Sequence, residues 1–293
     1  ILGTAVQQDA GSLVALFALP QGEGGRMNYD PTKDAHDSYL AAIEAKRARG
    51  DTHDWENRPW KRREVIGDCT LYLGDMDTVL PALGAFDLCL TDPPYGIGEA
   101  RKQNASRSML ATSKDYGCSA WDDKPCSPEQ IAVMRASSRN QIIFGGNYFE
   151  LPPSSCWLVW DKQNGENDFA DCELAWTNLS KAVRRIYWRW HGMIRKGDDV
   201  REHPTQKPVG VMEWCLTHVP DARSVVDPFM GSGTTGVACV RRGVPFTGIE
   251  RHEPYFDIAC KRIADAVARP DLFISTTKAP EPVQQPLFGE SAA

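Results

Sequence analysis

The segment from 224 to 250 constrains the fold most, because it has the pattern of a strand, a glycine-rich turn, a helix and a second strand. Val225 and Val226 predict the first buried strand, and Phe246 to Ile249 predict the second. Gly231 and Gly233 allow the backbone to turn tightly between the first strand and the helix. Two strands joined in this way form a β-α-β unit, so we expect an α/β fold with a mostly parallel sheet and helices on both faces.

Glu250 ends the second predicted strand about 20 positions after the turn, where a carboxylate can accept from both hydroxyls of a ribose. We expect Thr234 and Thr235 to cap the intervening helix. Glycines 231, 233 and 236 also match the dinucleotide fingerprint, so an oxidoreductase using nicotinamide or flavin is a competing hypothesis. The late position of the loop and the lack of a second mononucleotide half after it disfavour this alternative.

A second informative turn follows residues 86–90, which are apolar except for Asp87 and predict a short buried strand. Asp92 would lie at the carboxyl end of that strand, where open α/β sheets bind their ligands. Pro93 and Pro94 have no amide hydrogen, so we expect a rigid turn whose carbonyl groups are free to accept from a ligand. Tyr95 adds a stacking face. Together these groups suit a flat ring that carries an amino group.

Asp92, Pro93, Pro94 and Tyr95 resemble the catalytic motif of the amino-group DNA methyltransferases, which methylate adenine N6 or cytosine N4. Residues 224–235 resemble the S-adenosylmethionine loop of that family, and 203–208 resemble the segment that closes over the methionine end. The catalytic motif precedes the cofactor loop, as in the permuted beta class. The resemblance covers 65–266 and implies a Rossmann-like S-adenosylmethionine-dependent methyltransferase fold. Thr205 is expected to cap the following helix, with Pro208 in its first turn and Lys207 beside the methionine carboxylate.

The resemblance, read with the residue chemistry above, implies two sets of site residues and no metal site. The catalytic set is the four-residue motif 92–95. Asp75 is expected near the cofactor adenine, although Gly67 and Asp68 form a pair similar to Gly74 and Asp75. The predicted cofactor-binding residues are Asp75, Asp92, His203, Thr205, Gln206, Lys207, Asp227, Phe229, Gly231, Ser232, Gly233, Thr234 and Glu250.

The net charge of −6 conceals two basic segments, 46–63 and 181–202, each with seven basic residues against three acidic ones. In the second segment aromatic residues alternate with arginines, which could follow a phosphate backbone and stack on a displaced base. The alternative is a β-strand with solvated arginines. The predicted DNA-binding residues are Arg101, Lys102, Arg107, Arg184, Arg185, Arg189, Trp190, Arg195 and Lys196.

We predict methylation of adenine N6 in double-stranded DNA, with the target base flipped out of the duplex and stacked on Tyr95. Cytosine N4 is the alternative, because the preference for adenine depends only on Asp92, where the cytosine enzymes more often carry serine. A glutamine methyltransferase with an Asn-Pro-Pro-Tyr motif and a catalytically silent DNA-binding module are less favoured. The recognition sequence, and the choice between an orphan enzyme and a restriction partner, do not follow from the sequence.

The 293 residues are expected to comprise a disordered leader (1–26), a helical segment (27–62), a methyltransferase domain (63–275) and a disordered tail (276–293). Recognition insertions are expected near 97–124 and 163–202. Gln284, Leu287 and Phe288 in the tail resemble a sliding-clamp peptide, and the class suggests a homodimer. Nine scattered cysteines predict core packing, and the lack of a long apolar run predicts a cytoplasmic protein. The family resemblance implies a bacterial or phage origin.

Overall fold

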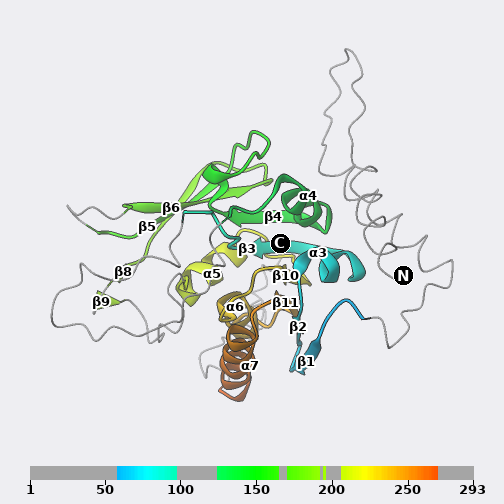
Figure 1. Cartoon of the computed structure of the whole chain (residues 1–293). Coiled ribbons are helices and arrows are strands. Elements are labelled where there is room, and N and C mark those ends of the chain that lie inside the picture. Colours follow the sequence, from blue (N-terminus) through cyan, green and yellow to red (C-terminus); the bar gives the residue numbers. More distant parts are fainter. Residues whose placement is uncertain (1–57, 98–123, 165–169, 192–193, 196–205, 270–293) are drawn as a thin grey trace, which may run out of the picture.

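A nine-stranded sheet organises the computed structural model, which describes residues 58–97, 124–164, 170–191, 194–195 and 206–269. Its strand order is β1-β2-β11-β10-β3-β4-β6-β5-β7, and β8 and β9 form a separate two-stranded sheet (Figure 1). The strands are β1 (Arg62–Ile66), β2 (Cys69–Leu73), β3 (Phe86–Thr91), β4 (Ser138–Phe144), β5 (Trp157–Asp161), β6 (Cys172–Thr177), β7 (Arg184–Tyr187), β8 (Trp190–His191), β9 (Ile194–Arg195), β10 (Val225–Asp227) and β11 (Phe246–Glu250).

The centre of the sheet is parallel, because β2, β11, β10, β3 and β4 pair in the same direction. β1 pairs antiparallel with β2, and β6 pairs antiparallel with both β4 and β5. β7 pairs parallel with β5 at the edge of the sheet. The helices are α3 (Met76–Val79), α4 (Pro128–Ala136), α5 (Val209–Leu216), α6 (Thr234–Arg241) and α7 (Glu253–Ala268), with short 3-10 turns η1 (Leu80–Ala82) and η3 (Gly146–Tyr148).

Two hydrophobic cores lie on opposite faces of the sheet, because successive strand side chains point to opposite sides. On β3, Leu88 and Leu90 pack into the core formed with α5, α6 and α7. Cys89, between them, packs into the core formed with α3 and α4. Figure 1 shows α5, α6 and α7 on one side of the sheet and α4 on the other. The fold is therefore the expected Rossmann-like α/β arrangement with helices on both faces.

The local sequence patterns predicted most of these elements correctly. The β-α-β unit is β10, α6 and β11, and the strand before the catalytic turn is β3. The helix α4 begins with a capping box between Ser127 and Gln130. The cysteines that the structure describes are all free, and most are buried, as predicted.

Two predicted helix caps are wrong. Gly233, with a φ of +79°, is the N-cap of α6, and the Thr235 hydroxyl donates instead to Asp227. A left-handed N-cap of this kind favours glycine, which explains why threonine does not occupy it. Pro208 is the N-cap of α5 and not a first-turn residue. Thr205, the predicted cap, lies outside the described residues.

Part of the expected recognition insertion at 163–202 belongs to the main sheet. β6 is an interior strand between β4 and β5, and β7 is the edge strand. The predicted leader, most of the N-terminal helical segment, the loop after the catalytic turn and the C-terminal tail lie outside the described part of the chain. None of the described helices has the length and apolar character needed to cross a membrane.

Candidate active site

Four carboxylates gather at one edge of the parallel sheet. Asp227 and Glu250 end β10 and β11, and Asp92 immediately follows β3. Asp75 follows β2 and is the N-cap of α3, where its side chain accepts from the Asp77 amide. Because β2, β11, β10 and β3 are adjacent and parallel, their carboxyl ends meet at this edge, which is where such sheets bind ligands.

The catalytic turn is held against the chain that precedes α4. The Cys126 amide donates to the Pro94 carbonyl at 3.0 Å, and Tyr95 forms an isolated β-bridge with Pro125. The Pro94 carbonyl therefore already accepts one backbone hydrogen bond, which the sequence did not predict. Within the described part of the chain, the Pro93 carbonyl accepts no such backbone bond. The Pro93 carbonyl can therefore accept from a ligand, as the sequence predicts for the carbonyls of this turn.

The ring of Tyr95 lies in an aromatic niche formed by the end of β4 and the turn after it. Tyr148 stacks on the ring at 5.0 Å with an interplanar angle of 12°, and Phe149 meets it edge-on at 6.2 Å. Gly145 lies directly beneath the ring, since a Cβ there would be 2.1 Å from Tyr95 Cε1. The niche therefore already holds one flat aromatic ring, that of Tyr148, stacked on Tyr95.

The most unusual feature of the site is a chain of alternating charges. The Lys207 ammonium nitrogen lies 2.5 Å from Asp92 Oδ2 and 2.9 Å from Glu173 Oε2, and the Lys207 side chain is only 6% exposed. Lys162 lies 2.7 Å from the other Glu173 oxygen. The Tyr95 hydroxyl donates to Asp92 Oδ1. Both Asp92 oxygens are therefore held by donors from this chain.

Burial and charge act in opposite directions on these groups. Burial raises the pKa of Asp92, although the Lys207 ammonium group opposes that shift. Burial also disfavours the charged form of Glu173, yet Lys207 and Lys162 prevail and lower its pKa to about 2. Despite its burial, Lys207 has a raised pKa because it faces Asp92 and Glu173. At neutral pH Lys207 is therefore charged and Glu173 is ionised.

Lys207 has partners that the sequence did not predict. It lies at the site, and its ammonium group binds Asp92 and Glu173. Its expected role as a ligand of the methionine carboxylate stays a prediction, which would use the third N–H of the ammonium group. Its neighbour Gln206 is buried, and the Gln206 carbonyl accepts from the Trp190 indole at 3.1 Å. His203 and Thr205 lie outside the described residues.

Asp227 forms hydrogen bonds with β3 and with both ends of the glycine-rich loop. Its Oδ1 accepts from the Thr91 hydroxyl at 2.7 Å and from the Phe229 amide at 3.1 Å, and its Oδ2 accepts from the Thr235 hydroxyl at 2.6 Å. Burial raises the pKa of Asp227 to about 6, although these donors oppose the shift. Asp227 therefore ties the catalytic strand β3 to the loop that precedes α6.

Glu250 lies against the same loop. Its carboxylate accepts from the Gly231 amide at 3.0 Å and from the His252 amide at 2.7 Å. Burial raises its pKa to about 7. A Cβ added at Gly231 would meet nothing within 4 Å, so open space faces the loop beside this carboxylate. The arrangement fits a bound ribose that donates its hydroxyls to Glu250.

Arg262 of α7 holds the far side of the loop. One guanidinium nitrogen donates to the Ser232 carbonyl at 2.7 Å, to the Ser232 hydroxyl at 2.9 Å and to the Thr234 hydroxyl at 3.1 Å. Ser232 and Thr234 are both buried. The hydroxyls of these two predicted cofactor residues therefore accept from Arg262, and these hydrogen bonds stabilise the loop.

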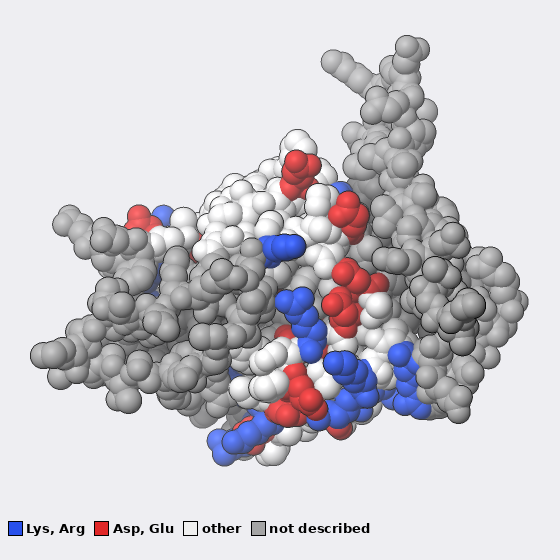
Figure 2. Space-filling view, viewed as in Figure 1, with Lys and Arg blue, Asp and Glu red and all other residues white. Residues whose placement is uncertain are grey.

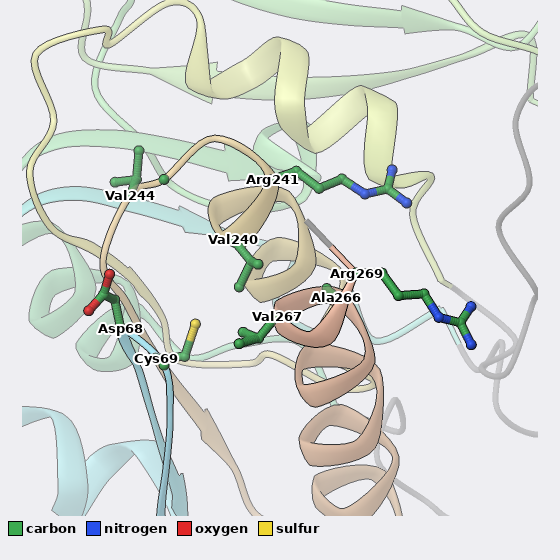
Figure 3. Close-up of a pocket in the computed structure, with 10 residues that line it drawn as sticks. Asp68, Cys69, Val240, Arg241, Val244, Ala266, Val267 and Arg269 are labelled. Carbon is green, nitrogen blue, oxygen red and sulfur yellow. The ribbon is translucent and has the colours of Figure 1, made fainter. Parts of the chain in front are cut away.

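The alternative adenine contact at Asp68 is wrong. Asp68 precedes β2 and lies at the opposite edge of the sheet from Asp92 and Glu250. It lines a cavity of about 230 Å³ together with Cys69, Val240 and Val244 (Figure 3). The Arg241 and Arg269 side chains extend away from the apolar side chains there. Asp75 is thus the acidic residue of the two that lies at the site edge.

The predicted DNA-binding segment divides into exposed and buried parts. Arg184, Arg185 and Arg189 are exposed, and the Arg185 guanidinium carbon lies 4.3 Å from the centroid of the Tyr187 ring. Trp190 is only 9% exposed and packs in the main core, so the prediction that it contacts DNA is wrong. Its indole is committed to the Gln206 carbonyl. No side-chain position is described for Arg101, Lys102, Arg107, Arg195 or Lys196.

Basic and acidic side chains alternate on the face shown in Figure 2. Among the residues described there, no broad area carries basic side chains alone. Arg184 and Arg185 of β7 and Arg189 after it are exposed, and they stay the described candidates for the predicted DNA-facing strand.

Several residues at the site were not predicted from the sequence. Glu173, Lys162 and Arg262 are isolated charged residues without a motif, and Tyr148 and Phe149 follow an ordinary strand. Only the spatial pairing of β6 with β4 and β5 brings Glu173 to Lys207. Gly145, Gly146 and the aromatic pair after them, immediately following a buried strand, were the available signal for the niche beside Tyr95.

Comparisons with known proteins agree with this geometry. Residues 121–261 match the family model of the N6 and N4 DNA methylases. The chain is 40% identical over 77 residues to the type II methyltransferase M2.LlaDCHI of Lactococcus lactis subsp. cremoris, which is 25% of this chain and 29% of that protein. It is 36% identical over 106 residues to M2.DpnII of Streptococcus pneumoniae, which is 36% of this chain and 35% of that protein. The matches thus span about a third of each relative.

The chain is also similar to solved structures of DNA methyltransferases. The M1.HpyAVI complex with SAM is 23% identical, with a TM-score of 0.41 over 66% of this chain and 99% of that one. The cytosine-N4-specific PvuII DNA methyltransferase is 13% identical, with a TM-score of 0.43 over 72% and 95% of the two chains. Residues 121–261, a little under half of this chain, are thus similar to the N6 and N4 DNA methylases, a family whose cofactor is S-adenosyl-L-methionine.

Proposed function

We propose that this protein transfers the methyl group of S-adenosyl-L-methionine to the N6 amino group of adenine in double-stranded DNA. The observation that carries the proposal is the meeting of Asp92 and Tyr95 with the Asp227 and Glu250 carboxylates at one sheet edge. One half of this edge suits an amino group on a flat ring, and the other half suits a ribose.

In the proposed reaction the cofactor supplies a sulfonium methyl group, whose carbon–sulfur bond breaks, leaving its electron pair on sulfur, as the amino nitrogen forms a bond to carbon. Asp92 and the Pro93 carbonyl hold the two amino hydrogens and draw the nitrogen lone pair out of conjugation with the ring. The base displaces the Tyr95 hydroxyl from Asp92 Oδ1 and stacks on the tyrosine ring. The proton released from the methylated nitrogen passes to Asp92 or to water.

Catalysis in this proposal depends on position and charge, with no covalent intermediate on the protein. Glu250 holds the ribose, Asp75 lies toward the adenine end, and the 229–234 loop encloses the remainder. Residues 203–205, for which no structure is described, stay proposed contacts of the methionine end. The negative charge of Asp92 then faces the amino nitrogen while that nitrogen becomes positively charged during methyl transfer.

Cytosine N4 is the second candidate acceptor, since its amino group has the same geometry and the matched family includes both activities. Adenine is preferred because an aspartate begins the motif. For DNA contact we propose the exposed Arg184, Arg185 and Arg189 together with the basic residues of 97–124 and 195–196. The domain boundaries at 26, 62 and 275 also stay proposals. So do a homodimer and a contact between 284–288 and a sliding clamp.

The test is transfer of a tritiated methyl group from the cofactor to duplex DNA. The wild type is expected to label DNA, and Asp92→Ala is expected to lose labelling while binding the cofactor normally. Asp68→Ala is the matched control, because Asp68 is exposed and lies at the opposite edge of the sheet. Equal labelling by Asp92→Ala and the wild type would refute the assignment of Asp92.

A further inference from the structure

We propose that Glu173 is a positioning residue for methyl transfer, which sets the acceptor strength of Asp92 by sharing the Lys207 ammonium group with it. The inference rests on the proposed function and adds a residue to that site. Glu173 has no motif in the sequence and comes from β6, which contributes no other residue to the proposed reaction.

The geometry supports a shared ammonium group. Lys207 Nζ lies 2.5 Å from Asp92 and 2.9 Å from Glu173, so one buried cation serves two carboxylates. Glu173 Oε2 is shielded from solvent and lies against this ammonium group. Glu173 Oε1 is held by Lys162 at 2.7 Å, and Lys162 also lies 5.2 Å from the centroid of the Trp160 ring. The position of Glu173 is therefore fixed from both sides.

The charge balance explains why such a residue matters to the reaction. Asp92 and Lys207 alone would form a neutral pair, which offers little negative potential to a nitrogen that is becoming positive. Glu173 competes for the same ammonium group and leaves the Asp92 carboxylate less neutralised. Lys162 acts in the opposite direction, because it draws Glu173 away from Lys207. The four groups thus tune the charge that Asp92 presents to the base.

Other titratable groups also face this centre. Asp92 is met by Tyr95 of the same turn and is influenced by Asp227 at the end of β10, in addition to Lys207 and Glu173. Tyr148 lies beside Tyr95. None of these groups is altered in the variants below, so a difference in pH dependence between variants reports on the Glu173 and Lys162 charges.

The experiment measures single-turnover methyl transfer to duplex DNA at saturating cofactor between about pH 5 and 9. Glu173→Gln removes the charge and keeps the shape, Glu173→Asp restores the charge, and Lys162→Met removes the opposing cation while keeping an apolar stem over Trp160. Asp171→Asn is the matched control, because it makes the same acid-to-amide change at an exposed position two residues before Glu173. Cofactor affinity and the thermal midpoint are measured for each variant.

Glu173→Gln is expected to slow the plateau rate roughly 30-fold, the effect of a unit charge about 8 Å from the reacting nitrogen at an effective dielectric constant of about 20. The acid limb of its pH–rate profile, where the rate falls as the pH decreases, should move to lower pH, because Glu173 raises the pKa of Asp92. Lys162→Met should move the limb to higher pH, and Glu173→Asp should recover most of the rate. Asp171→Asn should match the wild type.

A purely structural role for Glu173 predicts a different pattern. An unchanged rate in Glu173→Gln, or a slower rate whose acid limb does not move, would overturn the proposal. Limbs that move in the same direction in Glu173→Gln and Lys162→Met would also overturn it, and this comparison holds if Glu173→Gln folds poorly, since Lys162 is partly exposed. A wild type that binds the cofactor but labels no DNA would instead overturn the proposed function.

Discussion

Replacing Lys207 by methionine should destabilise the protein in a way that depends on pH. The substitution keeps an unbranched side chain but removes the buried cation between Asp92 and Glu173. Lys207 and Lys162 lower the pKa of Glu173 from 4.5 to about 2, which corresponds to about 3 kcal/mol at 1.36 kcal/mol per pKa unit. The loss of one partner from a buried pair gives a similar figure of about 3–5 kcal/mol.

The direction of the pH effect follows from the lowered pKa of Glu173. A carboxyl group with a lowered pKa stabilises the folded state fully above its unfolded value of 4.5, and this contribution is lost as the pH falls through about 2. Lys162 stays beside Glu173 in Lys207→Met, so the figure for losing one partner of a buried pair applies, and the variant should lose about 3 kcal/mol at pH 7.5. Its deficit against the wild type should shrink below about pH 4.5. In the variant, burial and the neighbouring carboxylate both favour protonation of Asp92.

Urea unfolding at several pH values between about 2.5 and 8, without cofactor, measures this deficit. Lys61→Met is a suitable control, because Lys61 is an exposed lysine immediately before β1. A deficit below about 1 kcal/mol at pH 7.5, as expected for an exposed ion pair, would refute the reasoning. A large deficit that stays constant down to about pH 2.5 would show that the loss comes from packing and not from charge.

Two further predictions concern the cofactor end and the base end of the site. Burial raises the pKa of Glu250 to about 7, so cofactor affinity should rise with pH through about 7 as the carboxylate becomes able to accept both ribose hydroxyls. Calorimetry should show this rise in the wild type and not in Glu250→Gln, and a pH-independent wild-type affinity would contradict the assignment. Gly145→Ala would place a Cβ 2.1 Å from Tyr95 Cε1, so the ring must move. Its single-turnover methyl transfer should fall at least about tenfold, because a misplaced stacking group costs positioning, while its cofactor affinity stays normal; an unchanged transfer rate would rule out a role for this niche.

Local sequence patterns predicted the parts of the fold whose causes are local. β10, α6 and β11 follow from a run of valines, a glycine turn and a second apolar run, all within 26 residues. β3 and the catalytic turn follow from an apolar strand that ends in two prolines. The caps of α5 and α6 were wrong, because a proline and a left-handed glycine occupy positions that the pattern assigned to threonines or to the first turn.

The parts that were not predicted depend on contacts between distant residues. Glu173 meets Lys207 only because β6 inserts antiparallel between β4 and β5, a pairing that no local pattern specifies. Trp190 has basic neighbours in sequence, yet packing against the segment before α5 buries it. Lys207 was assigned to the site from its motif, but its partners required the positions of two other strands.

The most direct test of the central claim is the identity of the methylated product. Duplex DNA would be incubated with the protein and an isotopically labelled cofactor, digested to nucleosides and analysed by mass spectrometry. We predict label in N6-methyladenine with the wild type and none with Asp92→Ala. Label in N4-methylcytosine alone would contradict the adenine assignment. The absence of labelled nucleoside, despite normal cofactor binding, would contradict the claim that Asp92 holds the amino group of a DNA base.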